Sequence, residues 1–380
     1  MEEERVSLLK CNTYAPALLD DIIERHMEQI NPTNDLIQSG TKVLIKPNLL
    51  MRRRPEDATT THPAFVAAVV RAVKRRGGVV TIADSPGGLY NKSALHSIYA
   101  ATGMEQVARE EGATLNYDTA TVERVNEDGV LCRHFEIITP AVQADMVISV
   151  GKLKTHAMTN YTGAVKNLFG VVPGLSKPEF HFRFPNKKDF GQMIVDLCET
   201  VSPTLSFVDG IVGMEGNGPS GGKAKAAGLT GASLNPHALD LLLARLIGFA
   251  PSEVPTLRAA VERRLCPVKI SDLDIVGDRA EQCICHFERP DSSSTDFMEN
   301  IRLPGFLRKP IRRLLTPRPE VRKADCIGCG KCAESCPRQV IHIENKKAHI
   351  YHAHCIRCFC CQEMCPVKAI DIRKFALFGG

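Results

Sequence analysis

Cysteines near the C-terminus have the type and spacing that are most specific for one kind of chemistry. Three cysteines at three-residue steps, followed by a fourth that precedes a proline, form one motif, and the motif recurs 29 residues later. Its members are Cys326, Cys329, Cys332 and Cys336, and then Cys355, Cys358, Cys361 and Cys365. Three thiolates at this spacing can bind three irons of one cubane, whereas the fourth closes the other cubane.

The repeat therefore predicts two [4Fe–4S] clusters that exchange their fourth ligands. The first cluster is expected on Cys326, Cys329, Cys332 and Cys365, and the second on Cys355, Cys358, Cys361 and Cys336. Cys360 lies outside the spacing and is not an expected ligand. Gly328 and Gly330 would let the first loop bend around its cluster. A zinc ribbon also uses paired cysteines, but it does not explain the third cysteine or the Cys–Pro ending.

Charge is distributed unevenly along the chain. Residues 321–380 carry 10 Lys or Arg and 5 Asp or Glu, whereas the first 320 residues carry 38 of each sign. A neutral body offers no electrostatic footprint for DNA or RNA, and the absence of Trp argues against stacking on single strands. We therefore expect no nucleic-acid partner. The basic tail would either raise the cluster potentials or compensate the clusters' negative charge.

The ends and linkers of the chain carry no membrane signal. The N-terminus lacks the pattern of a secretory signal, and no apolar stretch reaches the ~18 residues of a membrane span. Clustered cysteines that bind metal are typical of a reducing compartment, so we expect a cytoplasmic protein. The basic, proline-interrupted strap at 301–323 could dock an acidic redox partner or an anionic membrane surface. Packing between the two domains is the favoured interpretation, so peripheral membrane contact is not expected.

Strand-like and helix-like segments alternate before the cysteine motifs. Apolar runs that predict strands lie at 42–46, 79–83, 113–117, 145–150 and 205–208, and helical patterns lie at 63–76, 93–111, 190–200 and 236–248. Such alternation predicts an α/β fold with a mostly parallel sheet and helices on its faces. We expect this body at 1–287, a proline-rich basic linker at 288–320, and a small α+β domain of ferredoxin type at 321–375.

A basic run follows the strand predicted at 145–150. It contains Lys152, Lys154 and His156, with Lys166 a short way beyond. Ligands of open α/β sheets bind at the carboxyl ends of the strands, where such cations could hold a carboxylate or phosphate. His156 could also move a proton near neutral pH. These four residues are the predicted catalytic set, and the alternative is a solvated basic loop.

A glycine-rich segment at 210–223 follows another strand and is predicted to be a lid over the substrate, or else a plain turn. Neither phosphate-binding glycine fingerprint is present, so ATP and a nicotinamide cofactor are not supported. Polar residues near the same strand ends are expected to bind the substrate. They are Asn48, Asp84, Asn167, Asp209, Glu215 and Asn217.

Six further cysteines precede the repeat. Cys283 and Cys285, with His286, could touch a metal, but the favoured interpretation is a partly buried strand end that puts both thiols on one face. The others are expected to be inert core thiols. They are Cys11, Cys132, Cys198 and Cys266.

Five segments of the body together resemble the domain-of-unknown-function family three-six-two. They are 45–48, 81–87, 151–156, 163–170 and 209–219. The tail, at roughly 318–375, resembles bacterial-type ferredoxin domains with two clusters, which members of that family often carry. The family implies no general activity. This chain departs from it at Asn235-Pro-His237, where similar proteins tend to have an acidic residue, which weakens the case for a metal carboxylate there.

Two hypotheses of function follow. In the first, the protein is an iron–sulfur redox enzyme whose clusters supply electrons to a small anionic substrate in the body. In the second, it is an electron carrier or an assembly partner whose body docks other proteins. A redox partner protein is expected in both cases.

Overall fold

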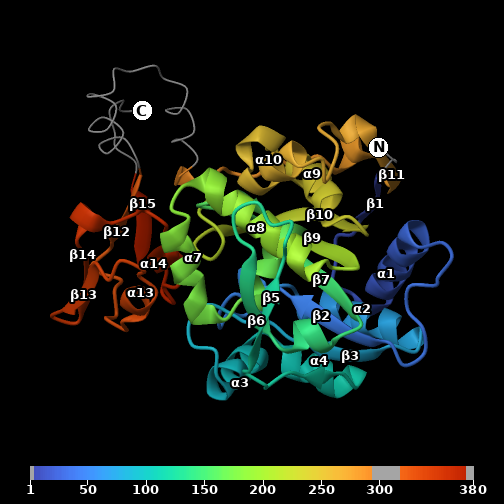
Figure 1. Cartoon of the computed structure of the whole chain (residues 1–380), viewed down its shortest axis with the longest axis horizontal. Helices are drawn as coiled ribbons and strands as arrows, with labels where there is room; N and C mark the ends of the chain where they lie inside the picture. Colours follow the sequence, from blue (N-terminus) through green and yellow to red (C-terminus); the bar gives the residue numbers. More distant parts are fainter. Residues whose placement is uncertain (1–3, 293–316, 374–380) are drawn as a thin grey trace.

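The computed structural model describes residues 4–292 and 317–373. A large α/β body is followed by a small unit that lies beside helix α7 (Lys177–Arg183) in Figure 1. The α/β fold with a small C-terminal ferredoxin-type region is confirmed. Most of the predicted linker and of the basic strap lies outside the described residues.

One nine-stranded sheet forms the centre of the body. Its strands, in spatial order, are β11 (Leu273–Gly277), β1 (Glu4–Lys10), β10 (Lys223–Ser233), β9 (Leu205–Glu215), β7 (Met146–His156), β2 (Lys42–Pro47), β3 (Val79–Ile82) and β4 (Thr114–Leu115), with β8 (Asn160–Thr162) folded back on β7. Neighbouring strands run parallel except at β10 and β8. The predicted mostly parallel sheet is therefore confirmed, and its parallel strands end at one edge.

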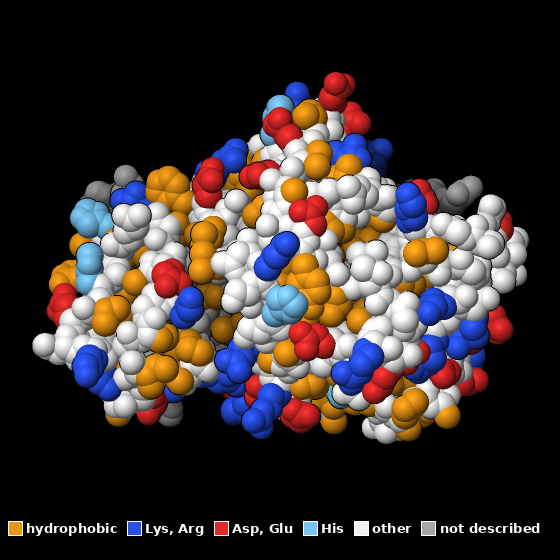
Figure 2. Space-filling view, turned by 90° about the horizontal axis from the view of Figure 1, so that it is seen from below, with side chains coloured by type: hydrophobic (Ala, Val, Ile, Leu, Met, Phe, Trp, Pro, Cys, Tyr) orange, Lys and Arg blue, Asp and Glu red, His pale blue; other side chains and the backbone are white. Residues whose placement is uncertain are grey.

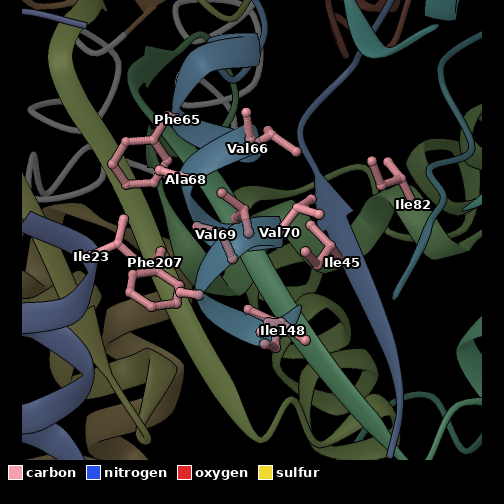
Figure 3. Packing of buried hydrophobic residues seen from close by; sticks show 14 of the residues in the cluster. Ile23, Ile45, Phe65, Val66, Ala68, Val69, Val70, Ile82, Ile148 and Phe207 are labelled. Atoms are coloured by element: carbon pink, nitrogen blue, oxygen red, sulfur yellow. The ribbon is translucent and has the colours of Figure 1, made fainter. Parts of the chain in front are cut away.

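Helices cover both faces of this sheet. One face is packed by α1 (Pro16–Ile30), α2 (Pro63–Arg75), α3 (Lys92–Ala101) and α4 (Met104–Glu111). Figure 3 shows side chains of α2, such as Phe65 and Val69, packed against Ile148 of β7 and Phe207 of β9. The other face is packed by α6 (Ala164–Asn167), α8 (Lys187–Val201), α9 (Pro236–Leu246) and α10 (Pro255–Glu262).

Local sequence explains where several helices begin and end. Pro63 opens α2 at a position where a missing N–H costs nothing, and the His62 ring accepts a hydrogen bond from the Ala64 N–H. The single helix predicted at 93–111 is wrong. It is divided into α3 and α4, because Gly103 adopts a left-handed backbone with φ of 78°.

Two predictions about loops are also corrected. Strand β7 does not end at Val150 but continues to His156, so the basic run lies within the sheet. Strand β9 likewise continues to Glu215 and pairs with β10, so only residues 216–222 form the turn of a hairpin. Half of the predicted glycine-rich lid at 210–223 is therefore strand.

The remaining elements are short. The body adds α5 (Pro140–Gln143), α7 and the hairpin of β5 (Thr121–Val125) and β6 (His134–Ile138). The small unit contains β12 (Arg318–Val321) paired with β15 (Ile370–Arg373), β13 (Ile341–Glu344) paired with β14 (Lys347–Ile350), and the helices α13 (Lys331–Glu334) and α14 (Cys360–Glu363). Within the described residues, every helix is too short or too polar to cross a membrane.

Candidate functional site

The structure groups the cysteines of the repeat across the two motifs. The Cys332 thiol interacts with the thiols of Cys329 and Cys365. The Cys355 thiol interacts with those of Cys358 and Cys336. The fourth cysteine of each motif thus lies near cysteines of the other motif. The Cys361 thiol also interacts with Cys332, and the assignment of the eight cysteines to two clusters stays a prediction.

The surroundings of these cysteines fit an iron–sulfur group. Three backbone N–H groups donate to cysteine sulfurs, from Ala348 to Cys326 at 3.3 Å, from Arg357 to Cys355 at 3.4 Å and from Ala369 to Cys365 at 3.1 Å. Such donors stabilise negative charge on thiolates. The thiols also pack among buried apolar side chains, including Val340, Ile341 and Ile370.

The two cysteine loops share one backbone shape. Gly328 and Gly330 have φ of 67° and 79°, and the residues 29 positions later, Arg357 and Phe359, have φ of 60° and 62°. The second loop therefore adopts the left-handed conformation without glycine. The glycines of the first loop indicated this bend from the sequence, but the second loop gave no such signal.

Helix α14 attaches the small unit to the body. The Gln362 side chain donates to the Asn217 carbonyl at 2.9 Å, and the Ser220 hydroxyl donates to the Glu363 carbonyl at 2.7 Å. Phe359 packs against Ala157 of the body. Figure 2 shows hydrophobic side chains along the line where the small unit meets the body.

A cavity of about 90 Å³ lies at this junction. The body contributes residues that follow β2 and β3, together with α6 and α7, and the small unit contributes residues of α13 and α14. Among the predicted site residues, four line it. They are Asn48, Asp84, Lys166 and Asn167.

A buried ion pair forms one wall of the cavity. The Lys46 ammonium lies 2.6 Å from Asp84 and donates to the Asn167 side chain at 3.0 Å. Asp84 also accepts from the Leu49 N–H at 2.9 Å. A side chain at Gly170 would collide with both charged groups, so glycine is required there. The pair is held in place and neutral overall.

Lys166 is the lysine of this wall that forms no hydrogen bond or ion pair among the described residues. Its ammonium lies 5.3 Å from the centre of the Phe169 ring and 6.0 Å from that of Phe190. Burial lowers its pKa, and the negative charge of Glu363 opposes this shift. By contrast, Lys177 donates to the carbonyls of Val172 and Ser85, and burial lowers its pKa to about 7.

The other three predicted catalytic residues lie on β7 and do not line the cavity. Lys152 pairs with Asp209 at 2.8 Å, and Lys154 donates to the Asn48 side chain at 2.8 Å. His156 accepts from the Met158 N–H at 3.0 Å, and its Nε2 lies 3.4 Å from the Glu363 carboxylate. All three are at most 2% exposed, so the alternative of a solvated loop is wrong.

Burial dominates the electrostatics of these residues. It lowers the pKa of Lys152, while the carboxylate of Asp209 opposes the shift. The pKa values of Lys154 and His156 fall well below their usual range, because both are buried near the positive charge of Lys166. Burial therefore disfavours the charged form of the His156 ring.

The remaining predicted substrate residues have structural partners. Asp209 binds Lys152, the Glu215 carboxylate accepts from the Glu288 N–H at 2.9 Å, and the Asn217 side chain donates to Asp291 at 2.8 Å. None of the three lines the cavity.

The earlier cysteines are as expected, with one correction. Cys11, Cys132, Cys198 and Cys266 are buried thiols. The strand end predicted around Cys283 and Cys285 is wrong, since Cys283 ends a short 3-10 helix and no strand follows within residues 284–292.

Comparisons with known proteins agree with the two parts of the chain. Residues 43–245 match the model of a domain of unknown function, DUF362, and residues 325–374 match a 4Fe-4S dicluster domain. A thylakoid-associated protein of Synechocystis sp. is 33% identical over 264 residues, which cover 68% of this chain and 78% of that protein. The chain belongs to the DUF362 family. Its tail accordingly binds a 4Fe–4S cluster.

A solved structure also matches this DUF362 protein. It is the lactate racemase apoprotein from Thermoanaerobacterium thermosaccharolyticum, at 14% identity and a TM-score of 0.41. The match covers 64% of this chain, which spans 57% of that structure.

Several cavity residues of this DUF362 protein were missed by sequence reasoning. Ser85, Lys177, Cys360 and Glu363 all line the cavity. Ser85 follows the predicted strand at 79–83, so the rule that ligands bind at strand ends could have found it. Glu363 had no signal, because nothing in the sequence shows where the small unit attaches.

Proposed function

We propose that this protein is an iron–sulfur redox enzyme that delivers electrons to a small anionic substrate in the cavity between its two parts. The observation that carries this proposal is the composition of the cavity wall. The body supplies Lys46 and Lys166, and the small unit supplies Cys360 and Glu363. Both residues of the small unit lie within two positions of Cys361, which we assign as a cluster ligand.

Two [4Fe–4S] clusters are assigned to the small unit. Their ligands are Cys326, Cys329, Cys332 and Cys365 for the first, and Cys355, Cys358, Cys361 and Cys336 for the second. When bound, the clusters supply electrons one at a time. Both sets adjoin the cavity, the second through Cys361 of α14 and the first through Cys332 of α13, but Cys329 of the first set is exposed. Electrons from a redox partner protein would therefore enter at the first set.

The residues of the body hold and shield the substrate. The Lys166 ammonium is placed to bind an anionic group, since the described residues offer it no hydrogen-bond acceptor. Phe169 and Met364 line the same space and give it an apolar wall. Because Lys46 is paired with Asp84, it contributes a fixed dipole rather than a free charge. We place this chemistry in the cytoplasm, where thiols stay reduced.

The test starts with protein purified without oxygen. Two clusters predict about eight irons and eight sulfides per chain, and a dithionite-reduced spectrum by electron paramagnetic resonance. The reduced protein is then mixed with small anions while the visible absorption of the clusters is followed. We expect a substrate anion to reoxidise the clusters. The rate should be at least about tenfold slower in Lys166→Gln. It should be unchanged in Lys188→Gln, because Lys188 is exposed and lies outside the cavity.

The carrier hypothesis predicts a different result. About four irons per chain would overturn the assignment of two clusters. If only partner proteins reoxidise the clusters and no small anion does, the enzyme hypothesis is overturned. The protein is then a carrier whose body docks other proteins.

A further inference from the structure

Three polar groups on the cavity wall form no hydrogen bond among the described residues. The Ser85 hydroxyl and the Oε1 atom of Glu363 are buried without a partner, and the third group is the ammonium of the half-buried Lys166. Ser85 is 1% exposed and Glu363 is 9% exposed. Buried polar groups are nearly always hydrogen-bonded, and two exceptions beside an unpaired lysine around one cavity indicate a ligand that satisfies them.

The three groups differ in what they can bind. Lys166 only donates, the Ser85 hydroxyl donates or accepts, and a carboxylate oxygen of Glu363 accepts. Lys166 and Glu363 interact electrostatically but form no ion pair among the described residues, so the two groups leave space between them. His156 Nε2 lies 3.4 Å from Glu363 Oε1, but the two atoms form no hydrogen bond.

The number of unpaired lysines on the cavity wall limits how many anionic groups the ligand can have. Of the lysines on the cavity wall, Lys46 is paired with Asp84 and Lys331 with Glu334, and the ammonium of Lys177 donates to carbonyls. Lys166 therefore remains to hold one anionic group. A second anionic group on the ligand would approach the carboxylate of Glu363 and be repelled.

Size and polarity limit it further. A volume of about 90 Å³ is well below the ~300–1,000 Å³ of clefts that hold drug-sized ligands, which favours a compact ligand over a nucleotide or a flavin. The rest of the wall is mainly apolar, with Leu50, Pro86, Phe169, Leu175 and Met364. The ligand is therefore a compact molecule with few atoms beyond its polar groups.

We propose that the cavity binds a small monocarboxylate with a hydroxyl or amino group on the carbon next to the carboxylate. The carboxylate accepts hydrogen bonds from the Lys166 ammonium and the Ser85 hydroxyl, and the neighbouring hydroxyl or amino group donates to Glu363. The small unit thus completes the binding site through α14. This inference rests on the proposed function, because it specifies the substrate class of the same cavity.

The test is calorimetric binding to the oxidised protein with its clusters, without any reductant. The probes are acetate, glycolate, glycine, malonate and inorganic phosphate. Glycolate and acetate differ by one hydroxyl, and a hydrogen bond to a charged group predicts that glycolate or glycine binds about tenfold tighter than acetate. Glu363→Gln should reduce this preference. Lys166→Gln should weaken the binding of every monocarboxylate by about tenfold or more. Lys188→Gln serves as the matched control and should bind as the unchanged protein does.

The probe series on the unchanged protein decides the proposal even if a variant fails to fold. The proposal would be overturned if phosphate or malonate bound more tightly than glycolate and glycine. It would also be overturned if acetate bound as tightly as glycolate and glycine. Iron content and the temperature of unfolding show whether each variant retains its fold. If glycolate or glycine binds but no monocarboxylate reoxidises the reduced protein, the redox function fails while the ligand class stands. If another kind of anion reoxidises it, the function stands and the ligand class fails.

Discussion

Two glycines of the first cysteine loop share a left-handed backbone but differ in what surrounds them. A side chain at Gly328 would collide with the carbonyl oxygen of Lys346, whereas one at Gly330 would meet nothing within 4 Å. Gly328→Ala must therefore move the backbone beside Cys326 and Cys329, while Gly330→Ala costs only the strain of φ, about 1–2 kcal/mol. We expect Gly328→Ala to lose roughly half of its iron, since one of two clusters is affected, and Gly330→Ala to keep most of it.

The measurement is iron and acid-labile sulfide per chain after purification without oxygen. Gly330→Ala is the matched control, because it changes the same residue type in the same loop. Equal losses in both variants would show that the backbone angle, and not the contact with Lys346, limits the loop. A full iron content in Gly328→Ala would mean that the first cysteine loop tolerates a side chain at this position, as the second loop does at Arg357.

At the scale of single elements, the short helix α6 positions the cavity residues Lys166 and Asn167. Asp240 of α9 fixes the start of this helix, since it accepts from the Ala164 N–H at 2.7 Å and from the Val165 N–H at 3.0 Å. The Tyr161 hydroxyl also donates to it at 2.8 Å. Burial raises the pKa of Asp240 to about 6, and these hydrogen bonds oppose the shift.

This raised pKa predicts how stability depends on pH. Because the folded protein holds the Asp240 proton more tightly than the unfolded chain, the contribution is complete below the unfolded pKa of 3.8 and is lost as pH rises through about 6. Relative to Asp240→Asn, the free energy of unfolding of the unchanged protein should fall by about 1–2 kcal/mol between pH 5 and 7 and then level off. Thermal unfolding of both proteins across this range checks it. Parallel curves would contradict the raised pKa.

Sequence patterns predicted the strands and helices whose apolar periodicity is local, such as β2, β3 and α2. They failed where burial depends on a distant partner. Lys152 and Lys154 looked like the start of an exposed loop, but they are buried in β7 because Asp209 and Asn48 supply their partners from other strand ends. A buried charge is tolerated only with such partners, and a single sequence does not show them.

At the scale of the whole molecule, the candidate site exists only because the two parts meet. The cysteine repeat predicted the small unit, and the alternation of elements predicted the body, yet neither pattern contains the attachment of α14. The contacts of Ser220 and Asn217 with α14 join residues that are 143 and 145 positions apart in the chain, respectively. Glu363 could therefore be recognised as a cavity residue only in the folded structure.

Removal of the clusters should consequently alter the body as well as the tail. The small unit has only a small apolar core beside its cysteines, so we expect it to unfold without its clusters. The turn at 216–222 would then lose its hydrogen bonds from Gln362 and to Glu363, and its amides should exchange with deuterium at least about tenfold faster. Helix α1, which packs on the body alone, is the internal control. Hydrogen exchange followed by mass spectrometry, before and after chelation of the iron, measures both segments. If the turn keeps its protection when the clusters are gone, the small unit stays attached without them, and the site does not depend on the clusters for its shape.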